Sequence, residues 1–199
     1  MKLVSGFCHP LLMASYISLI LFFGAPELFT YSTETFRILL IAVFLTTCFI
    51  PALGIYLLKI FSKISNLEIT DRQERPLPFM SILIWYGFAC YLFVWKLQVG
   101  SPFSTIILTV SILIGLLLII TKWFKISIHS TAIWGGIGIL SALAISRGIM
   151  IDSILLSAII LGGLTNSSRL YLEYHNPREV WYGSILGFVF TFFAVIVWG

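Results

Sequence analysis

Apolar runs long enough to cross a bilayer recur along the whole chain, and they restrict its fold more than any other feature. A bilayer core about 30 Å thick takes roughly 20 residues of α-helix. Seven runs reach or approach this length, near residues 9–23, 36–61, 79–98, 102–121, 128–146, 151–168 and 180–198. Because a backbone in hydrocarbon must satisfy its own hydrogen bonds, these runs predict helices.

The predicted fold is therefore all-α, a polytopic transmembrane helix bundle of about six to seven spans. Hydrophobic residues make up 59% of the chain and charged residues 10%, too little polar surface for a soluble domain of this length. We expect a single integral membrane domain over residues 1–199, associated with membrane lipids. The stretch Met1–Gly24 has a second interpretation as a signal peptide, since Lys2 precedes an apolar run.

Other classes of site and partner find little support in the sequence. Cys8, Cys48 and Cys90 are scattered, without the paired spacing of a metal site or a disulfide framework, and are expected to be buried thiols. The formal charge is only +4, and no basic run resembles a nucleic-acid patch, so no nucleic-acid partner is expected.

Polar residues converge on one side of the predicted bundle. With seven spans, that side carries the N-terminus and the connections near 62–78, 122–127 and 169–179. All three histidines lie on or near it, as do nine of the twelve basic residues: His9, His129 and His175, with Lys2, Lys59, Lys63, Arg72, Arg75, Lys122, Lys125, Arg169 and Arg178. Ionisable groups at a membrane are costly, so this side is predicted to carry a functional site.

The first polar segment is KISNLEITDRQERPLP, residues 63–78. Ser65 and Glu68 have the spacing of a capping box, which predicts a short interfacial helix that starts at Ser65 and ends before Pro76. Arg72 and Arg75 would lie on one face of that helix. The alternative is a loop whose arginines only satisfy the positive-inside rule.

The second segment, residues 125–138, begins a helix. Ser127 is a predicted N-cap, which places His129 in the first turn of the fifth span. A helix N-terminus suits an anion such as phosphate. His129 could equally be an interfacial histidine without chemistry.

The third segment, residues 168–183, has the densest charge. Asn176, Pro177 and Glu179 fit the N-cap, N1 and N3 positions of the last helix, so Glu179 has a purely structural explanation. Its carboxylate could also reach a ring nitrogen of His175 and fix the tautomer. Arg169 could fork onto phosphate oxygens.

Together these residues resemble the phosphatidic acid phosphatase type 2 and vanadium haloperoxidase superfamily, over roughly residues 60–190. The family's third motif, S-R-x5-H-x3-D, is nearly complete: Ser168-Arg169, His175, and Glu179 for the usual Asp. Gly183 and Gly187 match the glycines that follow it in the family.

The other two family motifs are incomplete. The second, P-S-G-H, is ISIH here and keeps Ser127 and His129. The first, K-x6-R-P, keeps Arg75-Pro76 but has Glu68 where Lys is expected. Lys125 and Arg72 are the candidate replacements for the missing lysine, because both lie on the side of the matched motifs.

The resemblance implies a metal-independent lipid phosphate phosphatase without a cofactor. His175 would attack phosphorus, Glu179 would hold its far nitrogen, and His129 would protonate the leaving oxygen. The implied phosphate-binding residues are Arg169, Arg75, Arg72, Lys125 and Ser127. The implied location is integral to a bacterial cytoplasmic (inner) membrane. Phosphatidate, phosphatidylglycerol phosphate, polyprenyl diphosphate and a lipid A phosphate all fit as substrates.

Three questions stay open from the sequence. A phosphotransferase of the same superfamily would share the histidine chemistry, and a small transporter or binding protein could use the same charges as an anion path. The distribution of basic residues favours a cytoplasmic site, whereas the resemblance favours an extracytoplasmic one. The sequence does not indicate an oligomeric state.

Overall fold

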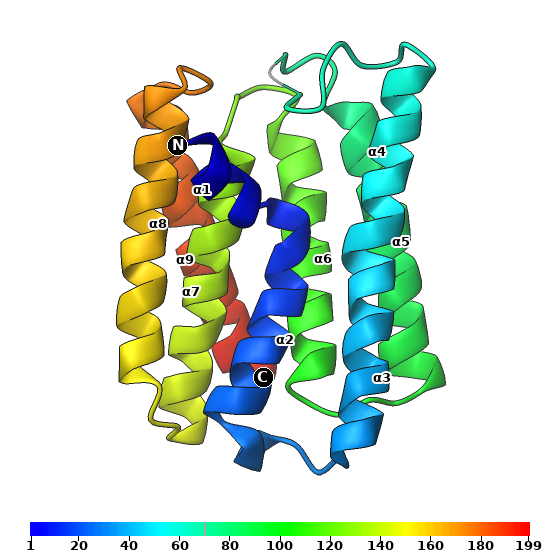
Figure 1. Cartoon of the computed structure of the whole chain (residues 1–199), viewed down its shortest axis with the longest axis vertical. Helices are drawn as coiled ribbons and strands as arrows, with labels where there is room; N and C mark the ends of the chain where they lie inside the picture. Colours follow the sequence, from blue (N-terminus) through cyan, green and yellow to red (C-terminus); the bar gives the residue numbers. More distant parts are fainter. Residues whose placement is uncertain (70) are drawn as a thin grey trace.

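The structure, a computed structural model, describes residues 1–69 and 71–199, without the side chains of Lys2, Val4 and Ser5. Every regular element in these ranges is helical (Figure 1), which confirms the all-α prediction. Six helical segments are long and apolar enough to cross a membrane. They are Thr33–Ile60 (α3 Thr33–Phe44, η3 Leu45–Phe49, α4 Ile50–Ile60), Pro76–Lys96 (α5 Pro76–Cys90, η4 Tyr91–Lys96), α6 Phe103–Ile120, α7 Ile128–Arg147, α8 Asp152–Tyr171 and α9 Pro177–Trp198.

The first predicted span is shorter than the other six. It consists of the 3-10 turn η1, Pro10–Leu12, and α2, Met13–Gly24. A six-residue helix α1, Lys2–Phe7, precedes it, and the turn η2, Pro26–Leu28, follows it. Figure 1 shows α2 in front of α6 and α7, with its chain ends on the same two sides of the bundle as those of the longer helices.

Helices α7 and α9 make the most extensive contact in the bundle. Glycine permits it, since a Cβ at Gly187 would overlap the carbonyl oxygen of Thr131, and one at Gly183 would lie 2.8 Å from that of Ser127. Thr191 of α9 adds an interhelical hydrogen bond of 2.8 Å to the Gly135 carbonyl oxygen. The G-x-x-x-G spacing of Gly183 and Gly187 is thus explained by a near contact of two backbones.

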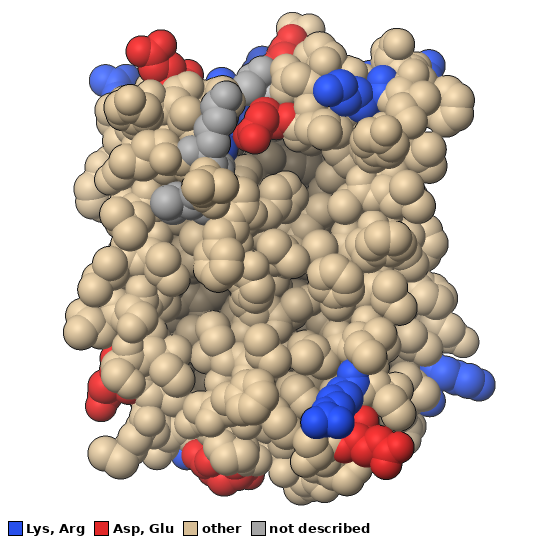
Figure 2. All heavy atoms as spheres, viewed as in Figure 1, with Lys and Arg blue, Asp and Glu red and all other residues tan. Residues whose placement is uncertain are grey.

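The three polar connections and the N-terminal segment meet at one end of the bundle, uppermost in Figure 1. On the face drawn in Figure 2, charged side chains gather at the two ends and leave an uncharged band between them. A buried apolar cluster that includes Ile64, Ile69 and Ile126 underlies the polar end. The predicted alternation of the connections thus agrees with the fold.

The predicted interfacial helix is wrong. The described residues between Phe61 and Arg75 form turns and bends, and α5 begins at Pro76 instead of the chain breaking there. Ser65 does not pair with Glu68: its backbone N–H and its hydroxyl both donate to the Glu74 carboxylate at 2.9 Å. Ser65 therefore closes a loop, and Pro76 occupies the first helical position, where its missing N–H is harmless.

The glycine contact gives a direct test of the α7–α9 interface. Gly187→Ala should lower the stability of the detergent-solubilised protein by about 1–3 kcal/mol, because the new methyl group would overlap the Thr131 carbonyl. The midpoint of thermal unfolding measures this. Gly115→Ala in α6 is the matched control, since nothing lies within 4 Å of its added Cβ. Equal midpoints for the two variants would contradict the close packing.

Candidate active site

His175 and Glu179 form a tight pair at the start of α9. The Nδ1 atom of His175 lies 2.6 Å from Oε2 of Glu179, and both side chains are largely buried, 3% and 12% exposed. A neutral ring that donates its Nδ1 proton to the carboxylate carries its lone pair on Nε2. The pair therefore defines one tautomer, the one whose free nitrogen can act as a nucleophile.

The predicted cap of α9 is also present, so Glu179 has both of its expected roles. The Asn176 side-chain oxygen accepts the Glu179 backbone N–H at 2.9 Å, and its amide donates to Oε1 of the same residue at 3.1 Å. One carboxylate oxygen thus belongs to the cap and the other to the histidine. The two interpretations of Glu179 describe different oxygens of one group.

Cations surround this pair. Lys125 Nζ lies 4.0 Å from the Glu179 carboxylate and donates to the Tyr174 carbonyl oxygen at 3.1 Å. Burial, followed by the charges of Arg75, Arg169 and Lys125, lowers the pKa of His175 to about 3. The Glu179 carboxylate opposes that shift, but desolvation and three positive charges outweigh it. His175 is thus an uncharged base at neutral pH.

Arg75 is buried at the N-terminus of α5. Its Nε atom donates to the Ile69 carbonyl oxygen at 3.1 Å, and its Nη1 atom donates to that of Ile126 at 2.7 Å. Burial lowers the pKa of Arg75 to about 10, which leaves the group charged at neutral pH. Arg75 therefore joins two of the polar connections and brings a fixed positive charge under them.

Arg169, near the C-terminal end of α8, is paired with a carboxylate. Its Nη1 and Nη2 atoms each lie 3.2 Å from Oε2 of Glu68, and its guanidinium carbon lies 4.6 Å from the centre of the Tyr174 ring. The Arg169 side chain is 2% exposed, whereas that of Glu68 is 44% exposed. Glu68, at the position where the motif resemblance expects a lysine, thus covers one edge of the Arg169 guanidinium.

His129 contacts His9, a histidine that was predicted to lie on this side of the bundle but was given no role. The rings of His129 and His9 contact edge to face, with centroids 5.6 Å apart. The Nδ1 atom of His9 accepts the backbone N–H of Leu11 at 3.3 Å, so its other nitrogen carries the proton. Burial lowers the pKa of His9, and Glu68 and Arg169 act on it in opposite directions. His9 lies in none of the three motifs, and its signal in the sequence was its place on the polar side of the predicted bundle.

Two predicted phosphate-binding residues have structural roles. Ser127 is the predicted N-cap of α7: its buried hydroxyl accepts the Ser130 backbone N–H at 3.4 Å and the Ser130 hydroxyl at 2.9 Å. Arg72 donates to the Lys122 carbonyl oxygen at 3.1 Å, which ties the loop to the end of α6. Of the two candidate replacements for the missing lysine, Lys125 is the one that contacts the His175–Glu179 pair.

No protein-family model, curated protein or solved structure matches the chain. Within the described ranges, no group of three or more His, Cys, Asp or Glu side chains has the geometry of a metal site. In the structure, the residues of the three motifs lie close together. Residues from α5, the α6–α7 connection, the end of α8 and the start of α9 interact at one end of the bundle.

The protonation state of His175 can be measured. In protein labelled with 15N-histidine, we expect His175 to stay neutral, with its proton on Nδ1, from pH 8 down to pH 5, because its pKa is lowered to about 3. An unfolded histidine titrates near 6.5. Protonation between these two values favours the unfolded chain, so this residue should also reduce stability progressively as the pH falls below 6.5. Titration of the His175 resonances near pH 6.5 would contradict the assignment.

Proposed function

We propose that the chain is an integral membrane phosphatase that hydrolyses a lipid phosphate or diphosphate through a phosphohistidine intermediate. The observation that carries this proposal is the 2.6 Å contact between His175 Nδ1 and the Glu179 carboxylate, surrounded by Lys125, Arg75 and Arg169. A neutral imidazole of fixed tautomer is a nucleophile, and the cations supply the positive charge that stabilises the phosphoryl oxygens in the transition state. We further propose a bacterial cytoplasmic (inner) membrane as its location.

The reaction would proceed in two steps. In the first, His175 Nε2 forms a bond to phosphorus while the bond from phosphorus to the leaving oxygen breaks, and that oxygen takes a proton from His129. Glu179 stabilises the positive charge that develops on the His175 ring. In the second, a water molecule gives a proton to His129 and attacks phosphorus, which releases inorganic phosphate and restores His175.

The local charges suit a phosphate monoester. Lys125, Arg75 and Arg169 carry three positive charges against the two carboxylates of Glu68 and Glu179. If phosphate takes the place of Glu68 on Arg169, the remaining excess is about two positive charges. A phosphate monoester carries close to two negative charges at pH 7. Exchange of Glu68 for the substrate would therefore balance the charges of Lys125, Arg75, Arg169 and Glu179, apart from the proton that His129 brings as general acid.

The central test is substitution of the histidine pair. His175→Ala should abolish phosphate release from a lipid phosphate by the purified protein, and Glu179→Gln should lower turnover by about 100-fold or more, because the amide lacks the charge that stabilises the imidazolium. Glu173→Gln is the matched control in the same connection, where the side chain is exposed. It should leave turnover unchanged.

The products and the stability of these variants complete that test. Release of inorganic phosphate supports a hydrolase, whereas a phosphorylated alcohol as the main product would indicate a phosphotransferase. Glu179→Gln keeps its backbone bond to Asn176, so its unfolding midpoint should stay close to that of the wild type. Near wild-type turnover in His175→Ala would refute the proposed mechanism.

The role of Glu68 can be separated from that of its neighbours. Vanadate imitates a phosphoryl group, and removing the competing carboxylate by Glu68→Gln should tighten vanadate inhibition roughly two- to fivefold, the range expected for a partly exposed ion pair. Glu74→Gln is the control, because Glu74 bonds to Ser65 and not to Arg169. Weaker inhibition in Glu68→Gln than in the wild type would mean that Glu68 holds Arg169 in place for phosphate.

A further inference from the structure

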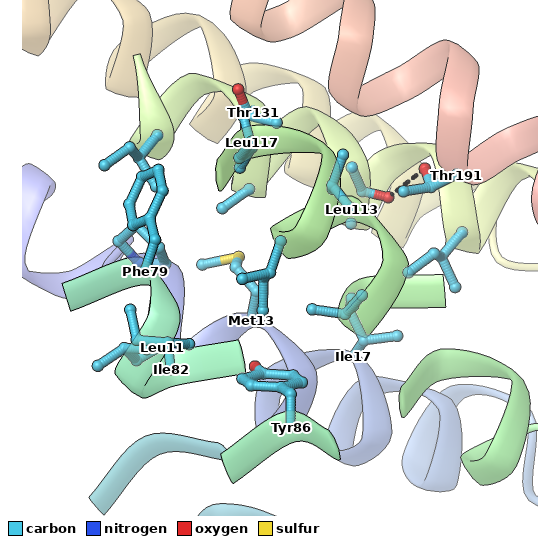
Figure 3. A pocket seen from close by; sticks show the side chains of 18 residues that line it. Leu11, Met13, Ile17, Phe79, Ile82, Tyr86, Leu113, Leu117, Thr131 and Thr191 are labelled. Carbon is cyan, nitrogen blue, oxygen red and sulfur yellow. Dashed lines mark hydrogen bonds between the residues drawn. The ribbon is translucent and has the colours of Figure 1, made fainter. Parts of the chain in front are cut away.

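His9 is held at the polar end of the bundle by its neighbours in the chain. Cys8, which precedes it, is buried in an apolar cluster with Ile133 of α7. Leu11, which follows it in η1, is buried in a separate cluster with Phe79 of α5, and Figure 3 shows both side chains around one apolar hollow. The backbone at His9 is therefore fixed between two packed residues.

The cap of η1 also fixes the charge of His9. Its Nδ1 atom accepts the Leu11 backbone N–H at 3.3 Å, and only an unprotonated ring nitrogen accepts such a bond. Burial lowers the pKa of His9, while Glu68 raises it and Arg169 lowers it. His9 is therefore a neutral ring whose one proton, on Nε2, is directed away from the Leu11 backbone.

This neutral ring contacts the residue assigned as general acid. The rings of His9 and His129 have centroids 5.6 Å apart and planes 83° apart, which is an edge-to-face arrangement. Because aromatic rings prefer such an arrangement, His9 limits the rotation of the His129 side chain, which is buried in the first turn of α7. An uncharged His9 also adds no positive charge that would oppose protonation of His129.

We propose that His9 is a positioning residue for His129, and that it holds the ring of the general acid in the orientation from which the proton is transferred. The role of His129 as the acid rests on the proposed function, whereas the contact between the two rings does not. One orientation serves both steps of the reaction, because the attacking water takes the place of the leaving oxygen. A proton donor must lie within hydrogen-bond reach of that oxygen, so a ring that rotates freely is a poor acid.

Two substitutions separate the His9 ring from the cap that it provides. His9→Asn removes the ring but keeps a side-chain oxygen for the Leu11 N–H. His9→Phe removes the cap acceptor but keeps a neutral ring. In His9→Asn we expect kcat for phosphatidate to fall roughly 10- to 100-fold, with KM changed by less than about threefold, because the acid is misaligned. In His9→Phe we expect kcat to stay within about threefold of the wild type.

A purely structural role for His9 predicts the opposite order of the two variants. The unfolding midpoint should be lower in His9→Phe than in His9→Asn, since only asparagine keeps the cap. If turnover followed stability, the phenylalanine variant would be the slower one. A kcat in His9→Asn equal to or above that in His9→Phe would therefore overturn the proposal.

The leaving group gives a second measurement. Nitrophenolate leaves without a proton, so hydrolysis of nitrophenyl phosphate does not need the general acid. His9→Asn should therefore slow the hydrolysis of phosphatidate and leave that of nitrophenyl phosphate nearly unchanged. In a His129→Ala background, His9→Asn should have no further effect on phosphatidate, because the residue that it positions is gone. Equal losses with both substrates, or an undiminished loss in that background, would contradict a positioning role.

The same experiments distinguish this inference from the proposed function. If the wild type releases phosphate and His9→Asn is equally fast, the phosphatase proposal stands and the positioning role fails. If the wild type releases phosphate from neither substrate, the phosphatase proposal fails, and 13C relaxation of the His129 ring then decides the positioning role. That ring should be more mobile in His9→Asn than in His9→Phe, and equal mobility in the two variants would refute the contact.

Discussion

The contact between α7 and α9 is the constraint on which the polar end of the molecule depends. Because Gly183 and Gly187 have no side chains, the two backbones approach so closely that no side chain fits between them. At the top of this contact the Ser127 backbone N–H donates to the Glu179 carbonyl oxygen at 3.1 Å. That bond places the first turn of α7, with His129, beside the first turn of α9. No side chain larger than hydrogen at Gly187 would preserve this spacing.

Features that depend on local chemistry could be predicted from the sequence. The spans follow from the lengths of the apolar runs, and the caps at Ser127 and Asn176 follow from side chains that bond within three residues. The interfacial helix could not be predicted correctly. The carboxylate that Ser65 needs comes from Glu74, nine residues away, so a local capping pattern gave the wrong partner.

The composition of the site was harder to foresee than its location. Arg169 and Glu68 are 101 residues apart in the chain, and nothing near either residue indicates that they form an ion pair. His9 approaches His129 because η1 and α2 dock on α7, which is a result of tertiary packing. Burying arginine costs desolvation energy that nearby acceptors must offset. Two carbonyl oxygens offset the desolvation energy of Arg75. The desolvation energy of Arg169 is offset by a partly exposed carboxylate, which is easier to exchange.

The order of α7 and α9 along the chain has a consequence for biogenesis. Helices enter the membrane in the order in which they are synthesised, so α7 is inserted before its principal partner exists. Until α9 arrives, Gly135 and Gly138 face lipid or another part of the nascent protein, and His129 and Arg75 have no His175–Glu179 pair beside them. The polar end can therefore form only after α9 has been synthesised, and a chain that stops before Pro177 lacks Glu179, the partner of His175.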